Sequence, residues 1–251
     1  MRTVAIIQAR LGSSRLPRKV LMDIAGVPML SRIIKRSAAA KSVDEVVVAT
    51  TTAPEDDALV AFAEKAEVGV FRGSVHDVLS RYYECAVKHK ADRIVRVTAD
   101  DPLKDPEVID RAIGHLDDAP DLDYCSNTIE PSYPEGLDIE AFRFSALERT
   151  YREAKLLSER EHVTPYIWKH RDLFNTLNFK FDRDLSDWRW TVDKPADIEF
   201  MQRVFGHFRD QPLVSFRSVI SWLEDHPEIR SINAGTVRNE GYKTSIATEN
   251  T

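Results

Sequence analysis

Short apolar runs alternate with longer amphipathic stretches through the first hundred residues, and this alternation constrains the fold more than any other feature. Runs rich in Val and Ile, bounded by polar turns, predict buried strands at residues 4–7, 45–49, 68–71 and 93–97. The stretches between them predict helices at 29–40, 56–65 and 75–88. Strands that alternate with helices favour right-handed βαβ units, so we expect an α/β fold with a mixed, mainly parallel central sheet flanked by helices.

The pattern changes after about residue 105, where predicted strands and helices no longer alternate regularly. Asp105 followed by Pro106 predicts a helix start, because aspartate caps helices and proline suits the first turn. Further strands are expected at 123–125, 138–142 and 177–181, with room for an antiparallel edge. We predict one domain over residues 1–232, with halves 1–104 and 105–232. The polar tail, residues 233–251, has no periodicity and is expected to be a loose arm or a dimer contact.

Charge and composition exclude several function classes. The net charge of −6 gives no general basic field that would attract nucleic acid, although a local Arg and Lys cluster can still bind a small polyanion. Cys85 and Cys125 supply neither a disulfide framework nor a CxxC metal pattern. No stretch approaches the roughly 20 apolar residues of a membrane span, and none resembles a secretory leader. We expect a cytoplasmic protein with no membrane partner.

A basic loop follows the first predicted strand, at the edge of an α/β sheet where ligands usually bind. Residues 8–19 combine Gly12 and two serines with three arginines and a lysine. Backbone amides of such a loop can approach phosphate oxygens, and the cations can neutralise a triphosphate. The loop matches neither the GxGxxG nor the GxxxxGK[ST] pattern, so composition alone leaves a solvated basic loop equally open.

Two segments place carboxylates where strands end. Asp100 and Asp101 follow the fourth predicted strand, and Asp193 lies where a strand leads into a helix. Carboxylate oxygens suit Mg²⁺, which proteins usually bind through one or two carboxylates together with substrate phosphates. Taken alone, the Asp101-Pro102 pair is better explained as a turn. Asp193 is explained equally well as the N-cap of the helix that follows.

A third segment, residues 72–81, combines a glycine with charged side chains. Ser74 can cap a helix with Asp77 at its third position, and Asp77 and Arg81 have the spacing of an ion pair on one helix face. Gly73, between a strand and a helix, also suits the close approach of a nucleobase or a phosphate to the backbone.

In their order and spacing these segments resemble the cytidylyltransferase family that includes the enzymes activating sialic acid and Kdo, and most closely its SpsF-like, spore coat polysaccharide branch. The likeness covers about residues 3–210. It rests on the loop at 8–19 with Val20-Leu21 and Gly26-Val27-Pro28-Met29, on Gly73-Ser74 with Asp77-Val78-Leu79 and Arg81, on Asp100-Asp101-Pro102-Leu103, on residues 133–140 and 160–165, and on Trp190-Thr191-Val192-Asp193.

The resemblance implies a Rossmann-like nucleotide-diphospho-sugar transferase fold, usually a homodimer, and a Mg²⁺-dependent transfer of CMP from CTP with release of pyrophosphate. Residues 1–104 would be the nucleotide-binding half and residues 105–232 the acceptor-binding and dimerisation half. Arg15 and Lys19 would hold the CTP phosphates, and Asp100 and Asp193 would hold Mg²⁺. The remaining substrate-binding candidates are Ala9, Arg10, Gly12, Ser14, Gly73, Asp77, Arg81 and Thr98 for the nucleotide, and Asn127, Glu140, Arg160 and His162 for the acceptor.

Two departures from the family pattern limit what can be carried over. Arg18 stands where the family usually has a glycine before the lysine, and glycine is the residue that adopts a positive φ without cost. Thr98 and Asp101 stand where the Kdo-activating branch has glutamine and glutamate. The acceptor therefore stays open among a sugar acid, a phosphorylated sugar or polyol, and a phosphonate destined for a surface polysaccharide.

Two other functions are weighed against this interpretation. A glycosyltransferase that consumes a nucleotide-sugar often carries an Asp-x-Asp metal motif, whereas Asp100 and Asp101 are adjacent here. A non-catalytic nucleotide-binding protein would not need Lys19, Asp100 and Asp193 together, and all three are present.

Overall fold

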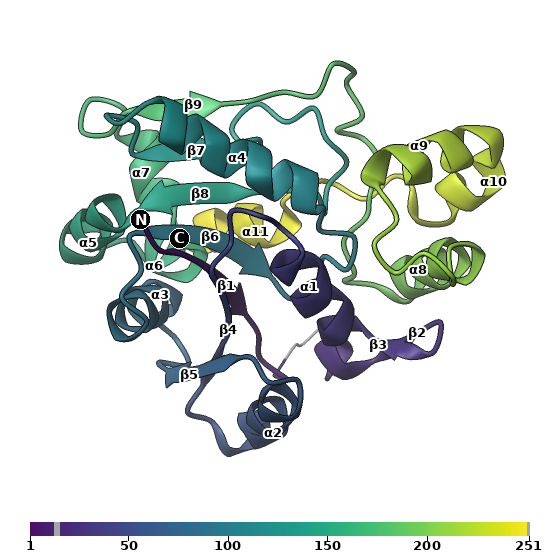
Figure 1. Cartoon of the computed structure of the whole chain (residues 1–251), viewed down its shortest axis with the longest axis horizontal. Coiled ribbons are helices and arrows are strands. Elements are labelled where there is room, and N and C mark those ends of the chain that lie inside the picture. The colour runs from purple at the N-terminus through teal and green to yellow at the C-terminus, as the bar shows by residue number, and fades with distance from the viewer. Residues whose placement is uncertain (13–15, 250–251) are drawn as a thin grey trace.

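The computed structural model describes residues 1–12 and 16–249, and its centre is a seven-stranded mixed sheet (Figure 1). The strands follow the spatial order β5-β4-β1-β6-β8-β7-β9. β8 runs antiparallel to both of its neighbours, β6 and β7, and the other neighbouring pairs are parallel. The predicted α/β fold with a mixed, mainly parallel sheet is confirmed. The strands are β1 Thr3–Gln8, β4 Glu45–Thr51, β5 Gly69–Gly73, β6 Arg93–Thr98, β7 Tyr124–Ser126, β8 Glu140–Arg143 and β9 Thr176–Asn178.

Helices cover both faces of the sheet (Figure 1). Side chains alternate across β1, so that Ala5 and Ile7 join the core under α1, α2 and α4, whereas Val4 and Ile6 join the core under α3 and α5. Asp105 caps α4 as predicted, because its carboxylate accepts a hydrogen bond from the Glu107 amide at 2.9 Å. The helices are α1 Met29–Ala38, α2 Asp57–Lys65, α3 Val78–Lys88, α4 Pro106–Asp118, α5 Phe144–Glu153, α6 Leu157–His162, α7 Pro165–Lys169, α8 Pro195–His207, α9 Phe216–Asp225, α10 Pro227–Arg230 and α11 Glu240–Glu249.

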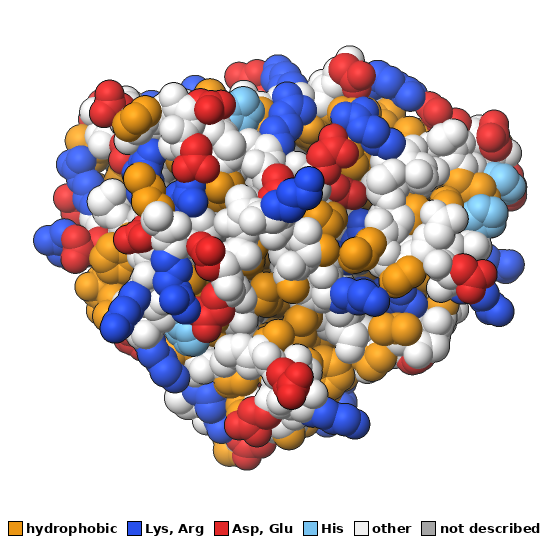
Figure 2. Space-filling model, in the orientation of Figure 1, with side chains coloured by type: hydrophobic (Ala, Val, Ile, Leu, Met, Phe, Trp, Pro, Cys, Tyr) orange, Lys and Arg blue, Asp and Glu red, His pale blue; other side chains and the backbone are white. Residues whose placement is uncertain are grey.

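Short elements complete the chain. β2 and β3 form a two-stranded ribbon, and the 3₁₀ helix η1 continues from the basic loop. Across the described part of the chain, every helix is too short or too polar to cross a bilayer. On the face seen in Figure 2, basic and acidic side chains are interspersed. These elements are β2 Asp23–Ile24, β3 Val27–Pro28, η1 Lys19–Leu21, η2 Pro54–Asp56 and η3 Ser231–Asn233.

Both cysteines belong to the two cores. Cys85 and Cys125 are buried and free, and burial raises the pKa of each thiol to about 12. They are therefore protonated at neutral pH and act as small apolar side chains.

The C-terminal segment differs from the loose arm that its polar sequence predicts. Residues 240–249 form α11, which packs against α6. Ser245 accepts or donates a hydrogen bond with His162 at 3.0 Å, and Glu249 accepts hydrogen bonds from the amide and hydroxyl of Ser158. Polar contacts and the single ring of Tyr242, and not an apolar stripe, hold this helix in place, which is why periodicity did not predict it.

Gly136 joins two distant parts of the second half of the chain. The amide of Glu135 donates to the carbonyl of Trp188 at 2.9 Å, and the amide of Trp190 donates to the carbonyl of Glu135. Between these bonds Gly136 has a φ of +105°, and a Cβ atom there would lie 2.5 Å from the backbone of Trp190. Only glycine allows this approach.

We expect Gly136→Ala to lower the free energy of unfolding by about 2–4 kcal/mol, because it adds both backbone strain and overpacking. Gly114→Ala is the control, since Gly114 lies in α4 with nothing within 4 Å of an added Cβ. That change should raise stability by about 0.5–1 kcal/mol through helix propensity. Urea titrations followed by circular dichroism measure both. Equal midpoints for the two variants would contradict the close approach at position 136.

Candidate active site

Two adjoining clefts open at the carboxyl ends of the parallel strands. The smaller cleft, of about 260 Å³, is lined by the loop after β1 and the start of α3. The larger cleft, of about 450 Å³, extends over the second half of the chain. The two clefts share Gln8, Thr98, Asp100, His162 and Gly241. Ligands of α/β sheets bind at this edge, so a substrate pair can occupy neighbouring sites here.

Lys19 lies where the clefts meet and contacts both predicted aspartates. Its Nζ is 2.7 Å from an oxygen of Asp193 and 3.1 Å from an oxygen of Asp100, and it donates to the carbonyl of Val192 at 2.9 Å. The backbone holds the same arrangement, since the amide of Val192 donates to the carbonyl of Asp100 at 2.9 Å. Three segments far apart in the sequence thus converge on one point.

The charges at this point stabilise one another. Burial disfavours the ammonium of Lys19, but Asp100 and Asp193 outweigh it and raise its pKa. Burial likewise disfavours the carboxylate of Asp100, and Lys19 lowers the pKa of that group below its usual value. Lys19 is therefore an ammonium and Asp100 a carboxylate at neutral pH.

Arg18 adopts the conformation that glycine usually supplies. Its φ is +58° and ψ is +17°, in the left-handed region, and it directly precedes η1. The left-handed turn delivers Lys19 to the aspartates, although an L-residue there costs about 1 kcal/mol relative to glycine. The departure from the family pattern leaves the turn intact.

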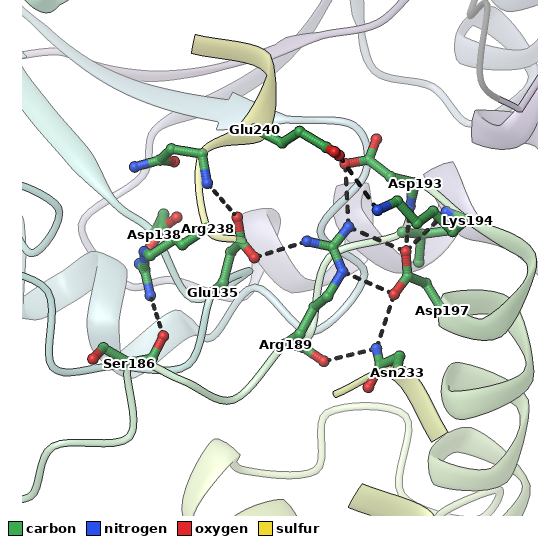
Figure 3. Close-up of polar contacts among 12 residues, drawn as sticks. Glu135, Asp138, Ser186, Arg189, Asp193, Lys194, Asp197, Asn233, Arg238 and Glu240 are labelled. Atoms are coloured by element: carbon green, nitrogen blue, oxygen red, sulfur yellow. Dashed lines mark hydrogen bonds and ion pairs between the residues drawn. The ribbon is translucent and has the colours of Figure 1, made fainter. Parts of the chain in front are cut away.

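A second cluster supports Asp193 from the other side (Figure 3). Arg189 is buried and donates to Glu135 at 2.8 Å, to Asp197 at 2.9 and 3.1 Å, and to Asp193 at 3.3 Å. Although burial opposes its charge, these carboxylates raise the pKa of Arg189. The Asp193 carboxylate therefore lies between Lys19 on one oxygen and Arg189 on the other.

The N-cap of α8 is Lys194, so the interpretation of Asp193 as the cap is wrong. The carboxylate of Asp197 accepts hydrogen bonds from the amides of Asp193 and Lys194 at 2.9 and 2.8 Å. Sequence reasoning missed Arg189, Glu135 and Asp197. A signal was present for one of them, because Asp197 follows a helix-initiating proline at the third helical position.

Asp101 pairs with a different lysine from its neighbour Asp100 and lines the larger cleft, whereas Asp100 lines both clefts. Its carboxylate is 2.8 Å from Nζ of Lys104 and accepts a hydrogen bond from Thr98 Oγ1 at 2.6 Å. Thr98 itself lines both clefts, in keeping with its place among the candidates. The two adjacent carboxylates thus belong to separate ion pairs, Asp100 with Lys19 and Asp101 with Lys104.

Glu140 and His162 both line the larger cleft, as expected of acceptor-side residues. Glu140 pairs with Arg96 and accepts hydrogen bonds from Tyr124 at 2.7 Å and from Thr164. Burial disfavours its charged form, but Arg96 lowers the pKa of Glu140 below its usual value. Burial lowers the pKa of His162 to about 4, so this imidazole is neutral at pH 7.

Asp77 and Arg160 contact each other instead of lining a cleft. Asp77 caps α3 by accepting from the Ser80 amide at 2.9 Å, and Arg160 donates to the same carboxylate at 2.7 Å. The helix begins at Val78, so the prediction that Ser74 is its cap is wrong. The predicted pair of Asp77 with Arg81 is also wrong. Arg81 donates to the carbonyl of Ser74 at 3.0 Å and lines the smaller cleft.

Three further candidates have structural roles. Asn127 is buried, and its amide group bonds the carbonyl of Leu137 and the amide of Ile139 at 2.9 and 2.8 Å. Gly73 lies against Arg81, whose Cγ would be 3.1 Å from an added Cβ. Gly12 leaves room for Glu55 in the same way. Of the described residues that line the two clefts, none is Asn127, Gly73 or Gly12.

Ala9 and Arg10 line the smaller cleft together with Lys19, as the basic loop predicts. Ser14 and Arg15 lie outside the described residues. The part of the loop that the structure describes therefore brings one arginine and one lysine to the site.

The two carboxylates beside Lys19, those of Asp100 and Asp193, fit a magnesium ion that enters bound to a nucleotide. Within residues 1–12 and 16–249, no three His, Cys, Asp or Glu side chains gather as a complete metal site. Asp100 and Asp193 are two hard-oxygen donors within 3.1 Å of one nitrogen, at the cleft junction. Two carboxylates with substrate phosphates are the usual protein environment of Mg²⁺.

This sheet order with clefts at its carboxyl edge defines a nucleotidyltransferase fold. The fold is shared at a TM-score of 0.65 with a CMP:2-keto-3-deoxy-manno-octonic acid synthetase solved with CTP, which is 22% identical and matches 83% of this chain and 100% of that one. The sequence profile of the cytidylyltransferase family matches residues 4–221, and the chain belongs to this family.

Two relatives are similar over almost their whole length. The spore coat polysaccharide biosynthesis protein SpsF of Bacillus subtilis is 32% identical over 89% of this chain and 94% of its own. A cytidylyltransferase from Leptospira borgpetersenii has a TM-score of 0.89 and 31% identity, and covers 95% of this chain and 100% of its own. The predicted likeness to the SpsF-like branch is thereby confirmed.

Proposed function

We propose that the protein transfers CMP from CTP to a small acceptor and releases pyrophosphate. The convergence of Lys19, Asp100 and Asp193 at the junction of two clefts carries this proposal. The smaller cleft has the cations Arg10, Lys19 and Arg81 for the nucleotide phosphates, and the larger cleft offers a neighbouring site for the acceptor. The bound partners then meet beside Asp100, which lines both clefts.

The reaction is a displacement at the α-phosphorus of CTP. An acceptor oxygen forms the new bond to that phosphorus, the bond to the bridging oxygen breaks, and pyrophosphate departs with that electron pair. A hydroxyl acceptor releases its proton to the solvent. Such reactions need alignment and charge stabilisation more than covalent help from the protein.

Each charged side chain has a defined part in this scheme. Lys19 and Arg10 face the nucleotide from the smaller cleft and neutralise phosphate oxygens, and we assign Arg15 to the same task. Asp100 and Asp193 would hold Mg²⁺, which when bound supplies positive charge to the phosphate oxygens. Arg81 and Thr98 lie beside the nucleotide site, and Glu140 and His162 beside the acceptor.

We infer that the acceptor is a sugar acid, a phosphorylated sugar or polyol, or a phosphonate used in a surface polysaccharide. The name of the SpsF relative supports the pathway class, and the synthetase whose fold the chain shares supports a sugar acid. We also propose a homodimer, as the family resemblance implies. The cytoplasm is the proposed location, because CTP is made and used there.

The test is a pyrophosphate-release assay with CTP, Mg²⁺ and a panel of acceptors. The panel contains 3-deoxy-manno-octulosonate and other acidic sugars, phospho-polyols and phosphonates. We expect turnover with CTP and one class of acceptor, and loss of more than about 90% of it when EDTA removes the divalent cation. Adding excess Mg²⁺ after the EDTA treatment should restore the rate, which shows that EDTA did not damage the protein irreversibly.

Two outcomes would contradict the proposal. Release of a nucleoside diphosphate from UDP-glucose without pyrophosphate from CTP would indicate a glycosyltransferase. Tight CTP binding with no pyrophosphate release across the panel would indicate a non-catalytic nucleotide-binding protein.

A further inference from the structure

The C-terminal segment, residues 236–249, closes one side of the larger cleft. Asn239, Glu240, Gly241 and Tyr242 line that cleft, and Gly241 lines the smaller cleft as well. The family profile ends at residue 221, so this wall is built outside the part of the chain that defines the family.

The start of this segment is fixed to the ion cluster around Arg189 (Figure 3). The guanidinium of Arg238 donates to the carbonyl of Tyr133 at 3.0 Å and pairs with Asp138. The amide of Asn239 donates to Glu135 at 3.0 Å, and Glu135 accepts from Arg189. The wall is thus joined through two side chains to Asp193.

The other end is fixed to α6, against which α11 packs. Glu249 accepts hydrogen bonds from the amide and hydroxyl of Ser158 at 2.5 and 2.7 Å. Ser245 donates to Glu161 at 2.8 Å. Contacts at both ends hold the segment in one position relative to the cleft.

Tyr242 gives this wall an aromatic surface. Its ring meets Trp168 edge to face at 5.8 Å and His162 at 5.1 Å, and Trp168 and His162 also line the larger cleft. The Tyr242 hydroxyl is buried and has no hydrogen-bond partner among residues 1–12 and 16–249. A buried hydroxyl without a partner is costly, and a turn of the Tyr242 side chain toward the cleft would let a bound ligand supply one.

We propose that residues 236–249 form the acceptor-specific wall of the active site and that Tyr242 contacts an acceptor with a sugar ring. The inference rests on the proposed function. A sugar offers C–H faces that pack on an aromatic ring and hydroxyls that bond its polar tip. A small phosphonate or a bare phosphate offers no such face, so the wall favours the sugar members of the acceptor panel.

Three variants test the inference with CTP, Mg²⁺ and the panel compound that wild type turns over fastest. Tyr242→Ala should raise the KM for the acceptor about tenfold or more, and Tyr242→Phe about two- to tenfold, the expected effects of losing ring contact and one hydrogen bond. Lys65→Ala is the control and should leave the KM for the acceptor within about twofold, because Lys65 is an exposed residue of α2 that lines neither cleft. The KM for CTP should stay within about twofold in all three.

The outcomes separate this inference from the function on which it rests. An acceptor KM within twofold of wild type in Tyr242→Ala would overturn the inference and leave the function intact. So would a parallel rise in the KM for CTP, which would indicate a general disturbance, or a fastest acceptor without a sugar ring. No turnover by wild type with any panel compound would contradict the proposed function itself. Thermal melts of each variant show whether the fold is retained.

Discussion

Lys19→Ala should slow pyrophosphate release by about 10²–10³-fold while the protein stays folded. The ammonium contacts Asp100 and Asp193 simultaneously, and its loss leaves these two carboxylates without that shared partner at the proposed phosphate site. The repulsion would weaken CTP binding, and the missing charge would no longer stabilise the departing pyrophosphate. The rate is measured in the pyrophosphate assay with saturating acceptor, alongside CTP binding by calorimetry.

Two further variants accompany this experiment, one as a control and one as a second test of the site. Lys35→Ala removes an exposed lysine of α1 and should leave the rate unchanged. Asp100→Asn keeps the shape of the side chain, removes one charge, and should also lose about 10²–10³-fold in rate. Near-wild-type turnover in both Lys19→Ala and Asp100→Asn would refute the assignment of this site.

Arg189→Met should lower the free energy of unfolding by about 3–5 kcal/mol at neutral pH, because it leaves buried carboxylates without their partner. Glu135, Asp193 and Asp197 all accept hydrogen bonds from this guanidinium. Methionine has a similar volume, so the loss reports charge and hydrogen bonding more than an empty space. Urea unfolding followed by tryptophan fluorescence measures the change.

The stability difference should shrink as the pH falls. Burial opposes the charge on Asp197, but Arg189 and the other hydrogen bonds lower its pKa below the usual value. The stability this carboxylate contributes is therefore present above its unfolded pKa and is lost as the pH falls through the lower folded value. Without Arg189 the carboxylates take up protons more readily, so the variant recovers relative to wild type in mild acid.

Arg203→Met provides the control for this prediction, because Arg203 is an exposed residue of α8. It should change stability by less than about 0.5 kcal/mol. A difference between wild type and Arg189→Met that is small at pH 7, or that grows in acid, would show that the cluster does not hold this part of the fold together.

The sequence predicted the parts of the site that follow from strand periodicity. Parallel strands end at one edge of a sheet, so a loop after β1 and a carboxylate after β6 had to meet. The family resemblance added Asp193, which periodicity alone could not place. Lys19 and both aspartates, which the structure brings into contact, were predicted in this way, and their catalytic roles belong to the proposed function.

Other parts of the site depend on contacts that local sequence does not encode. Arg189 reaches Glu135 only because Gly136 lets two distant segments approach, and no spacing rule relates these positions. Asn127 and Arg160 were assigned to the acceptor, but an amide can equally hold a loop and a guanidinium can equally bind a helix cap. Residue type did not distinguish these uses.

The backbone hydrogen bond between Val192 and Asp100 has a consequence for how the site responds to change. It ties the end of β6 directly to the segment that leads into α8, independently of any side chain. The spacing of the two acidic groups is therefore a property of the main chain, and a substitution at position 19 alters the electrical environment without releasing the frame that carries them. Replacing a side chain at this point can therefore change the chemistry while the hydrogen bond between the two backbone segments remains.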